Sequence, residues 1–536
     1  MVLYHICIRS LDTVHEPMLR FSGTPPEGKQ KMTNLLLQGR YVCPVCGLEQ
    51  DEPVGAHIRQ QHGERAFVQA VLDAKRTGMN DVQIGEQFGI TFKQLERIIT
   101  QAVGVNVSTL SPSKRIKSWE PTDFRLEITT VWSFKQRGSW ATHDGRYRGN
   151  WSPYIPRNLI LRYTKPGDLV LDPFVGGDTT AVEAKLLGRR CIARDINPAS
   201  VELTLENLRF NLPRTLFEES PIYEPEVSIG DARHLEGIAD NSVDLICAHP
   251  PYAGIISYTS GVEGDLSQLD VPKFLREMRQ VALECYRVLK PGSKCAVLIG
   301  DARQRKHVIP IGFHTIGVFL EAGFHLKELV IKRQHNCRTT GFWADRSLEH
   351  NFLLLAHEYL PIFEKPTGVS SYRTPLLSSA IVELPDTLEV SEPETATVWV
   401  FPCEALEQKV YANLYRRYGG ENSLNLIRVT VTQPGTKGHH VDIQTSLQRT
   451  LPQARQGGFV ILEVRDVRFD GYVLPLAKMA IDTLQGMPHG HSPNGHSPKL
   501  WLKEIIVVLP DDLPTSSNTE ELQIVHRYLL VYEVTA

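Results

Sequence analysis

The residues best suited to chemistry form a short loop, His249-Pro250-Pro251-Tyr252, directly after the apolar run Val243–Ala248. The run predicts a buried strand, and open α/β sheets bind ligands just outside the carboxyl ends of their strands. The two prolines fix φ and lack an N–H, so their carbonyls are held rigidly and can accept hydrogen bonds. With the flat face of Tyr252 beside them, these carbonyls can hold a planar group that carries an NH2. The alternative interpretation is a proline-rich turn that only ends a strand.

A glycine-rich turn lies earlier in the chain, between two predicted strands. The strand 168–172 is followed by Pro-Phe-Val-Gly-Gly-Asp-Thr-Thr at 173–180, then by a helix over 181–187 and a strand over 190–195. Glycines in the first turn of a βαβ unit let the backbone approach a ligand closely. Asp195 ends the second strand, where an acid suits the hydroxyls of a ribose. The combination indicates a nucleoside cofactor, with a solvated acid at a strand end as the alternative.

Four residues near the N-terminus have the spacing C-x2-C-x10-H-x4-H. Two thiolates on a tight turn and two imidazoles about one helical turn apart can close a tetrahedral zinc site. The spacing predicts a C2H2-like zinc finger, which either reads nucleic acid or is a structural clip. Four unrelated residues are the alternative. The predicted ligands are Cys43, Cys46, His57 and His62.

Residues 64–102 have the apolar spacing of helices and resemble a helix-turn-helix, with Gly89 in the turn and Thr91 as the next N-cap. The N-terminal residues of the last helix in such a unit face the major groove of DNA. These residues are Thr91, Lys93, Gln94 and Arg97. A helical bundle that binds nothing is the alternative, because residues 36–118 are only weakly basic.

Length and composition limit the remaining possibilities. A chain of 536 residues is too long for one core and suggests about three domains. The formal net charge of −3 gives no overall attraction to nucleic acid, so any such contact requires local patches. The clusters at 146–148, 303–306 and 332–338 are candidates, with solvated faces as the alternative. Cysteines in apolar segments, no long apolar stretch and no signal peptide predict a cytoplasmic protein without membrane contact.

Strands alternate with helices over residues 124–365. The pattern predicts helices at 154–163 and 274–289, the second ended by the turn Arg287-Val-Leu-Lys-Pro-Gly. A strand-like stretch over 126–134 comes first. Seven further strands follow, at 168–172, 190–195, 227–231, 243–248, 296–299, 326–331 and 352–355. This order predicts a Rossmann-like α/β sheet of seven strands.

These motifs as a set resemble the S-adenosylmethionine-dependent amino-methyltransferases of DNA, which modify N4 of cytosine or N6 of adenine. Residues 172–180 are similar to the family's D-P-F-x-G-x-G-T-T cofactor loop, and 195–198 to its ribose-binding strand end. Residues 249–252 take the place of its [D/N/S]-P-P-[Y/F/W] catalytic loop. The resemblance covers 124–365 and implies a class I methyltransferase fold, S-adenosylmethionine as cofactor, DNA as partner and a restriction-modification context.

The resemblance also implies a role for each site residue. Asp231 would contact the cofactor adenine, and the segment 129–143, which contains Trp132, would pack on its methionine end. The cofactor-binding set is Asp172, Phe174, Gly176, Gly177, Thr179, Thr180, Asp195, Asp231 and Trp132. In the catalytic set His249, Pro250, Pro251 and Tyr252, the tyrosine would stack on a flipped-out base while His249 and the Pro250 carbonyl accept its amino N–H bonds. Cytosine and adenine present the same NH2 edge, so the loop does not choose between them.

Two positions depart from the family pattern. Asp178 stands where the family has its last glycine, which places a carboxylate near the cofactor. His249 replaces Asp, Asn or Ser, and an imidazole accepts a hydrogen bond only while it is neutral. Activity is therefore expected to fall below about pH 6. An inactive methyltransferase fold that serves as a DNA-binding regulator, and a base methyltransferase of RNA, are the alternative functions.

The C-terminal region repeats part of this pattern. Three blocks recur in the same order and with similar residues, 299–311 as 464–476, 326–331 as 502–507, and 357–360 as 526–529. Residues 396–536 are therefore predicted to be a degenerate copy of the later half of the methyltransferase sheet, a smaller α/β domain. Neither the glycine turn nor a Pro-Pro-Tyr loop occurs there, so the copy should be catalytically inactive. Chance similarity between strands is the alternative.

The predicted order of domains follows from these patterns. Residues 1–35 are poorly structured, 36–107 hold the finger and helix-turn-helix, 108–123 are a linker, 124–365 form the methyltransferase domain, 366–395 a second linker, and 396–536 the degenerate copy. The copy would serve DNA recognition, packing or formation of a homodimer. A separate restriction or defence partner is a further open question.

Overall fold

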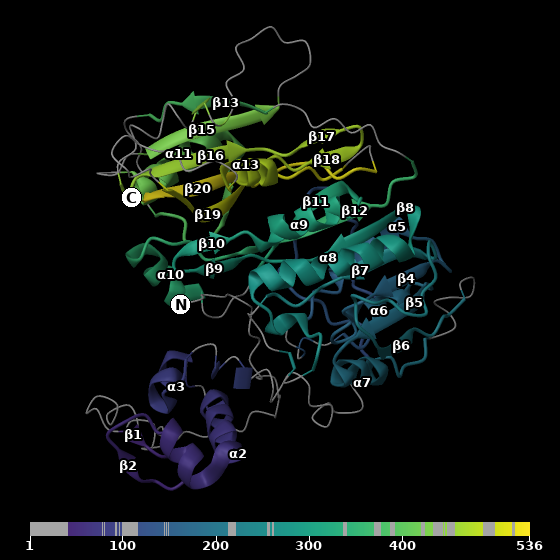
Figure 1. The fold of residues 1–536 in the computed structure, drawn as a ribbon, viewed down its shortest axis with the longest axis vertical. Helices are drawn as coiled ribbons and strands as arrows, with labels where there is room; N and C mark the ends of the chain where they lie inside the picture. Colours follow the sequence, from purple (N-terminus) through teal and green to yellow (C-terminus); the bar gives the residue numbers. More distant parts are fainter. Residues whose placement is uncertain are drawn as a thin grey trace.

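The computed structural model describes residues 41–535, apart from short gaps and the longer segments 99–115, 213–220, 369–376, 386–391, 432–442, 447–455 and 486–498. Figure 1 shows three parts: a small N-terminal unit around α2 and α3, and two sheets with their helices. The predicted unstructured segment 1–35 lies outside the described residues. No helix in the described part of the chain is long and apolar enough to cross a membrane.

The first sheet has eight strands in the order β3-β11-β12-β8-β7-β4-β5-β6. The strands β6, β5, β4, β7 and β8 run parallel, while β12 is antiparallel to both of its neighbours. The sheet has one strand more than the seven predicted, because part of the strand-like stretch 126–134 pairs with β11 at the edge. The bounds are β3 Val131–Ser133, β4 Leu169–Asp172, β5 Arg190–Asp195, β6 Glu226–Ile229, β7 Val243–Ala248, β8 Leu289–Val297, β11 His325–Arg333 and β12 His357–Glu364.

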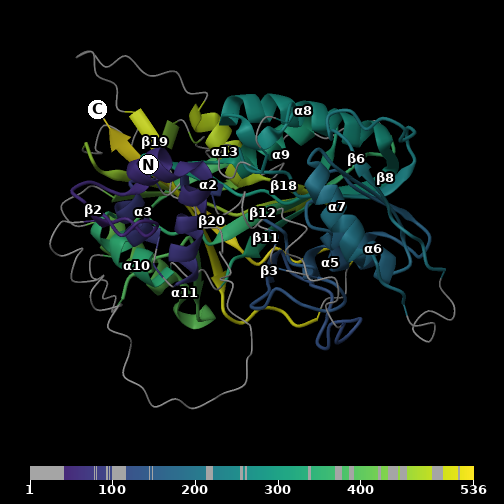
Figure 2. The same cartoon turned by 90° about the horizontal axis from the view of Figure 1, so that it is seen from below.

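Helices cover both faces of this sheet. Figure 2 shows α8 and α9 on one side and α5 and α6 on the other. Each side has its own apolar core: Phe274 and Met278 of α8 belong to one, Ile155 of α5 and Val182 of α6 to the other. The helices are α5 Tyr154–Tyr163, α6 Thr179–Leu186, α7 Pro198–Asn207, α8 Val271–Val288, α9 Ile311–Glu321 and α10 Thr340–Glu349. The predicted Rossmann-like layering is therefore present.

Two local predictions in this domain are wrong. The stretch 352–355 is not a strand, and its apolar side chains instead fill the contact between the two sheets, where the Leu353 N–H donates to Glu504 at 3.0 Å. The strand begins later, at His357. The turn expected at 287–292 is also absent, because β8 starts at Leu289 directly after α8. An apolar run shows that side chains are buried, but not which partner buries them.

The second sheet has six strands in the order β13-β15-β16-β20-β19-β14. Its first strand lies inside the predicted linker 366–395, so that prediction is corrected: β13 pairs antiparallel with β15. The predicted linker 108–123 is corrected at its end too, since Trp119 packs against the core beneath α5. The elements are β13 Leu377–Val382, β14 Val398–Phe401, α11 Leu406–Tyr418, β15 Leu424–Val431, β16 Phe459–Val464, α13 Leu476–Gln485, β19 Lys499–Pro510 and β20 Arg527–Thr535.

Each sheet sends a β-hairpin into the other part, with a buried arginine, Arg303, in the first hairpin and a half-buried one, Arg468, in the second. The first hairpin is β9 Ala302–Gln304 with β10 His307–Ile309, and the second is β17 Val467–Phe469 with β18 Tyr472–Leu474. Arg303 pairs with Glu504 at 2.5 Å, and Arg468 pairs with Glu328 at 2.6 Å. Glu328 and Glu504 occupy equivalent strands, β11 and β19, so the two contacts are reciprocal.

The N-terminal unit has a ββα order. The strands β1 Tyr41–Val42 and β2 Glu49–Gln50 form a hairpin, followed by α2 Gly55–Arg76 and α3 Asp81–Phe88. Gly63 interrupts α2 with a φ of 85°. Ile58 and Phe67 of α2 share one apolar core with Phe88 of α3 and with Leu95. The finger-like segment and the helices after it are thus a single packed unit.

Candidate functional site

The predicted site residues meet at one edge of the first sheet. Asp172, Asp195 and His249 end or directly follow β4, β5 and β7, and Asp231 follows β6 by two residues. These four strands are parallel and adjacent, in the order β7-β4-β5-β6. Their carboxyl ends therefore bring together residues that lie up to 77 positions apart in the chain. This is the edge at which α/β sheets bind ligands.

The glycine turn is tied to the end of the next strand. The Gly176 N–H donates to Asp195 Oδ2 at 2.9 Å, and the Asn197 N–H donates to Oδ1 at 2.9 Å. Burial raises the pKa of Asp195 to about 6, although these two hydrogen bonds lower it. A carboxylate has about four lone-pair sites, so the half-buried Asp195 can still accept hydrogen bonds from ribose hydroxyls.

Gly176 and Gly177 of the turn each need to be glycine, for different reasons. Gly176 has a φ of 54°, which favours glycine. At Gly177 a Cβ would lie 2.7 Å from the Cβ of Tyr147, so a side chain there would displace the tyrosine that covers the turn. Asp178 has a φ of 116° although it is not a glycine, and its side chain is fully buried. The departure from the family pattern therefore places a buried carboxylate on strained backbone.

The remaining residues of the turn are mainly structural supports. Asp172 Oδ1 accepts the Phe174 N–H at 2.9 Å, and burial raises the pKa of this carboxyl to about 7 against the effect of Thr180. Thr179 donates to Asn150 at 2.5 Å, and both Thr179 and Thr180 are buried. Phe174 alone of this group keeps a half-exposed side chain that a ligand could touch.

Asp231 is engaged by a neighbouring arginine. Arg233 donates to both of its carboxylate oxygens, at 2.7 Å and 3.1 Å, and also reaches Glu277 at 2.5 Å. Burial raises the pKa of Asp231, but the guanidinium outweighs it and leaves that pKa below its usual value. Asp231 is thus an ionised acceptor beside Gly264, whose Cβ would lie 3.1 Å from it.

The structure does not bring Trp132 to this edge. Trp132 lies on β3, which four strands separate from β4, and its fully buried indole donates to the Thr129 carbonyl at 3.0 Å. The sequence prediction for Trp132 is therefore corrected to a core residue. Residues just after the predicted segment 129–143 cover the glycine turn instead, through Tyr147 and Asn150. Residues 144, 146 and 148 lie outside the described residues.

The loop 249–252 follows β7 at the centre of the edge. His249 is half-buried and stacks on Trp151, with ring centroids 5.6 Å apart at an angle of 25°. Its Nε2 lies 3.3 Å from the Tyr252 hydroxyl. Pro250 is buried, whereas Pro251 is half-buried.

Tyr252 is held by an acid that sequence reasoning missed. Its hydroxyl donates to Glu358 Oε1 at 2.5 Å, and Lys332 pairs with Glu358 Oε2 at 2.7 Å. The ring packs against Gly300, where a Cβ would lie 3.0 Å from Tyr252 Cε2. Glu358 and Lys332 face each other on the antiparallel strands β12 and β11. The comparison of the two repeats offered a signal, because Arg527 replaces Glu358 in the C-terminal copy.

The electrostatics of this cluster change one prediction. Burial lowers the pKa of His249 to about 4, with Glu358 raising it and Lys332 lowering it. Burial raises the pKa of Glu358, but Lys332 and the hydrogen bond from Tyr252 outweigh it and bring that pKa to about 2. His249 is therefore neutral at pH 6, and the expected loss of activity moves from about pH 6 to about pH 4.

Two of the clusters considered for phosphate binding have other partners. Arg303 is buried and paired with Glu504, and Lys332 is paired with Glu358. In the cluster 146–148, Arg146 and Arg148 lie outside the described residues, as does Arg338 of the cluster 332–338. A run of basic residues in the sequence does not show that the charges are solvated.

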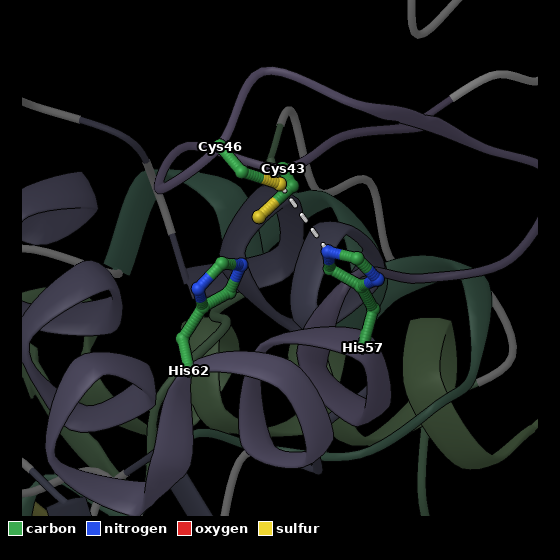
Figure 3. Close-up of side chains that lie close together, drawn as sticks. All are labelled: Cys43, Cys46, His57 and His62. Atoms are coloured by element: carbon green, nitrogen blue, oxygen red, sulfur yellow. Dashed lines mark hydrogen bonds between the residues drawn. The ribbon is translucent and has the colours of Figure 1, made fainter.

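The four predicted metal ligands converge. Ligand atoms of Cys43, Cys46, His57 and His62 all lie within 4.8 Å of one another, and Figure 3 shows the two sulfurs facing the two imidazoles. The thiols come from the turn between β1 and β2, and the imidazoles come from the first two turns of α2. Among the described residues the buried Nε2 of His62 has no hydrogen-bond partner. Two sulfur and two nitrogen donors in this arrangement fit a tetrahedral zinc ion.

The segment after α3 begins with the predicted N-cap. The Gln94 N–H donates to Thr91 Oγ1 at 3.3 Å, and the Thr91 N–H donates back to Gln94 Oε1 at 2.8 Å. This reciprocal pair is a capping box. Thr91, Gln94 and Arg97 are exposed, and Lys93 lies outside the described residues.

Comparisons with known proteins agree with the geometry at this edge. A family model for N6 and N4 methyltransferases, described as DNA methylase, matches residues 11–206. This interval contains the glycine turn and Asp195 but ends before His249. The prediction for the loop 249–252 therefore depends on its position after β7 and not on the family model.

Curated relatives match shorter stretches. A tRNA (guanine(10)-N2)-dimethyltransferase of Methanothermobacter thermautotrophicus is 38% identical over 120 residues, 22% of this chain and 32% of that protein. The type II methyltransferase M2.DpnII of Streptococcus pneumoniae is 36% identical over 85 residues, 15% of this chain and 31% of that protein. M1.MboII of Moraxella bovis is 37% identical over 89 residues, which are 16% of this chain and 34% of that protein. The matches thus span about a third of the length of these relatives.

Solved structures match weakly. TrmN from Thermus thermophilus has a TM-score of 0.25 and 20% identity, over 40% of this chain and 49% of that one. This TM-score is too low to assign the fold, so the fold is assigned from the strand order of the sheet. The family model and the type II relatives confirm the resemblance that the motifs predicted: part of this chain is similar to the DNA amino-methyltransferase family.

Proposed function

We propose that this chain transfers a methyl group from S-adenosylmethionine to the exocyclic amino group of a base in DNA, N4 of cytosine or N6 of adenine. One observation carries the proposal: the Pro-Pro-Tyr loop and the glycine turn follow adjacent parallel strands, β7 and β4. A rigid acceptor for a planar amine thus lies beside a turn suited to a nucleoside cofactor.

The chain's own residues would bind, orient and shield the reacting groups. S-adenosylmethionine, when bound, supplies the electrophilic methyl group. Asp195 would accept the ribose hydroxyls, and the half-exposed Phe174 would pack on the ligand. The base amino group is inaccessible inside a duplex, so the base must be flipped out before it reaches the loop. Catalysis then depends on positioning and electrostatics, without a covalent enzyme intermediate.

At the loop, the neutral His249 imidazole and the Pro250 carbonyl would accept the two amino N–H bonds. Both contacts direct the nitrogen lone pair away from the loop and toward the methyl group. Tyr252 would supply the aromatic contact for the flipped base, with its hydroxyl already fixed at Glu358. The amino group is the same in cytosine and adenine, so both bases stay within the proposal.

The other two parts would serve recognition. The Cys43, Cys46, His57 and His62 set would hold a structural zinc ion, and Thr91, Lys93, Gln94 and Arg97 would face the major groove. The C-terminal part would be a degenerate copy without catalytic loops, packed on the methyltransferase domain as a permanent partner. Its reciprocal contacts through Arg303 and Arg468 support this role.

A second candidate function is methylation of RNA. The tRNA (guanine(10)-N2)-dimethyltransferase is named for transfer to an exocyclic amino group of a base, the same kind of acceptor. The capping box at Thr91, which fits a helix-turn-helix, favours DNA. The two functions share the site and differ only in the nucleic acid.

Methyl transfer to matched substrates separates the functions. The purified chain should transfer labelled methyl groups to duplex DNA and leave transfer RNA unlabelled, and sequencing of the modified DNA identifies base and site. Tyr252→Ala should weaken binding of the flipped base by about 1–3 kcal/mol. Labelling of RNA alone would select the second candidate. No labelling, together with no thermal stabilisation by S-adenosylmethionine, would leave the inactive DNA-binding regulator.

A further inference from the structure

Blocks of residues 299–360 recur in residues 464–529, and we call these two regions the first and second repeat. Comparing the two repeats separates structural residues from functional ones. His357 Nε2 lies 3.0 Å from the Tyr359 hydroxyl, and His526 Nε2 lies 2.9 Å from the Tyr528 hydroxyl. The same contact occurs on β12, beside the catalytic loop, and on β20, where no such loop exists. Contacts that both repeats keep therefore belong to the shared fold and need no explanation from catalysis.

The position between each histidine and tyrosine differs. It is Glu358 on β12 and Arg527 on β20. Its partner across the sheet differs as well: Lys332 faces Glu358, whereas Val508 faces Arg527. The second repeat also has ion pairs at this position, because Arg527 pairs with Glu407 and with Glu463. Only the first repeat, however, places a carboxylate there, held by Lys332 and in contact with the Tyr252 hydroxyl of the loop 249–252. This difference indicates a role for Glu358 and Lys332 at that loop.

The hydrogen bonds of this cluster have only one consistent direction. An ionised carboxylate is acceptor-only, so Glu358 takes the Tyr252 hydroxyl proton at 2.5 Å and a Lys332 proton at 2.7 Å. With its proton directed to Glu358, the Tyr252 oxygen can only accept from His249 Nε2, 3.3 Å away. A neutral imidazole carries one N–H, so a proton on Nε2 leaves the lone pair on Nδ1.

We propose that Lys332 and Glu358 are positioning residues that act through Tyr252 to fix His249 as its Nε2–H tautomer, so that Nδ1 is the acceptor offered to the base. The inference rests on the proposed function, which identifies the amino group of the base as the donor to His249 Nδ1. It also explains how histidine can replace Asp, Asn or Ser at this position. Those side chains always carry an acceptor oxygen, whereas an imidazole offers a given nitrogen as acceptor only in one tautomer.

Nitrogen NMR of the full chain tests the tautomer without any activity. With ring-15N histidine, the signals of His249 are those lost in His249→Gln. At pH 7 we expect a protonated Nε2 and an unprotonated Nδ1. In Tyr252→Phe, which keeps the ring, this preference should weaken toward a mixture of tautomers. An Nδ1–H tautomer in the unaltered chain, or no change in Tyr252→Phe, would overturn the proposal.

Kinetics test whether the tautomer matters for transfer. Glu358→Gln should lower kcat by about ten- to a hundredfold, the range for residues that orient a ligating histidine, with little change in KM for the cofactor. Because Glu358 acts through the Tyr252 hydroxyl, Glu358→Gln should have little further effect in a Tyr252→Phe background. Additive losses in the double variant would contradict the relay.

Arg527→Gln is the matched control, since it alters the equivalent position of the other repeat. It should leave kcat unchanged, while thermal unfolding of all variants reports any loss of fold. An equal loss of kcat in Arg527→Gln would show a general structural effect and refute the assignment. If the unaltered chain methylates no nucleic acid, the proposed function fails, but the NMR result still decides the tautomer.

Discussion

The two repeats have a common frame and differ at the loops that a reaction needs. In the first, Asp301 accepts the Gly312 N–H at 2.9 Å, and in the second Asp466 accepts the Ala477 N–H at 3.3 Å. Burial raises the pKa of both carboxyls to about 7. A buried acid with a raised pKa would ordinarily suggest a catalytic group. Such an acid recurs in the repeat that lacks the glycine turn and the loop 249–252, so it is part of the fold that both repeats share.

The same comparison explains the misplaced tryptophan. Trp132 donates to the Thr129 carbonyl at 3.0 Å, and Trp399, at the equivalent edge strand of the second sheet, donates to the Ala396 carbonyl at 2.9 Å. Trp399 has no glycine turn near it in the sequence. The indole therefore packs at the outermost strand of each sheet, β3 and β14, and does not indicate a cofactor site. Positions that differ between the repeats, such as Glu358 and Arg527, identify the site more reliably.

Metal removal should have the largest effect, and it tests whether the N-terminal unit is independent of both repeats. Structural zinc contributes about 10–16 kcal/mol to the folding of small finger units. Chelation, or Cys43→Ser, should therefore unfold residues 41–98, as monitored by hydrogen exchange, and leave exchange in the two sheets unchanged. Unchanged exchange in the N-terminal unit after chelation would show that no structural metal is bound there.

The reciprocal arginines should have the next largest effect. Arg303→Met leaves the fully buried Glu504 without its partner, and loss of one member of a buried pair costs about 3–5 kcal/mol. Arg468→Met should destabilise by a similar but smaller amount, because that pair is less buried. Denaturant unfolding measures both. As a control, Arg303→Met with Glu504→Leu should recover most of the stability, and a loss in only one of the two arginine variants would break the equivalence of the repeats.

Acid sensitivity should be specific to the first repeat. With a pKa of about 4, His249 stays neutral as pH falls to about 5, and activity is lost as pH falls through about 4, where the imidazole takes up a proton. Lys332 lowers this pKa, so Lys332→Met should move the acid limb of the kcat profile to higher pH. Lys503→Met, which alters the second repeat, is the control and should leave the limb in place. A limb already at pH 6 in the unaltered chain would contradict the neutral-histidine role.

The smallest effect is expected at Asp178. Its φ of 116° costs a residue other than glycine about 1–2 kcal/mol. Asp178→Gly should therefore stabilise the chain by about 1 kcal/mol and strengthen cofactor binding by removing a buried carboxylate. Thermal unfolding and titration with S-adenosylmethionine measure the two effects. Weaker cofactor binding in this variant would show that the carboxylate is itself a ligand.

Patterns local in the sequence were sufficient for much of the fold. The predicted helix 154–163 has the bounds of α5, the strand 190–195 has those of β5, and the spacing of the four metal ligands predicted their convergence. Periodicity, turn residues and ligand spacing act over a few turns of chain, so they can be recognised without knowledge of distant partners. The repeated blocks 299–311 and 464–476 each contain a hairpin in the structure, β9–β10 and β17–β18.

Only the tertiary structure decided which buried residue contacts which partner. Glu358 lies 106 residues after Tyr252, and Glu504 lies 201 after Arg303, separations at which sequence patterns give no distance. The apolar run at 352–355 shows the same limit, since its hydrophobicity predicted burial and the contact between the sheets determined where. The sequence by itself determined most of the elements around the site and the residues of the loop 249–252. The order of the strands determined which charges surround that loop, because strand order alone brings β11 and β12 to its side.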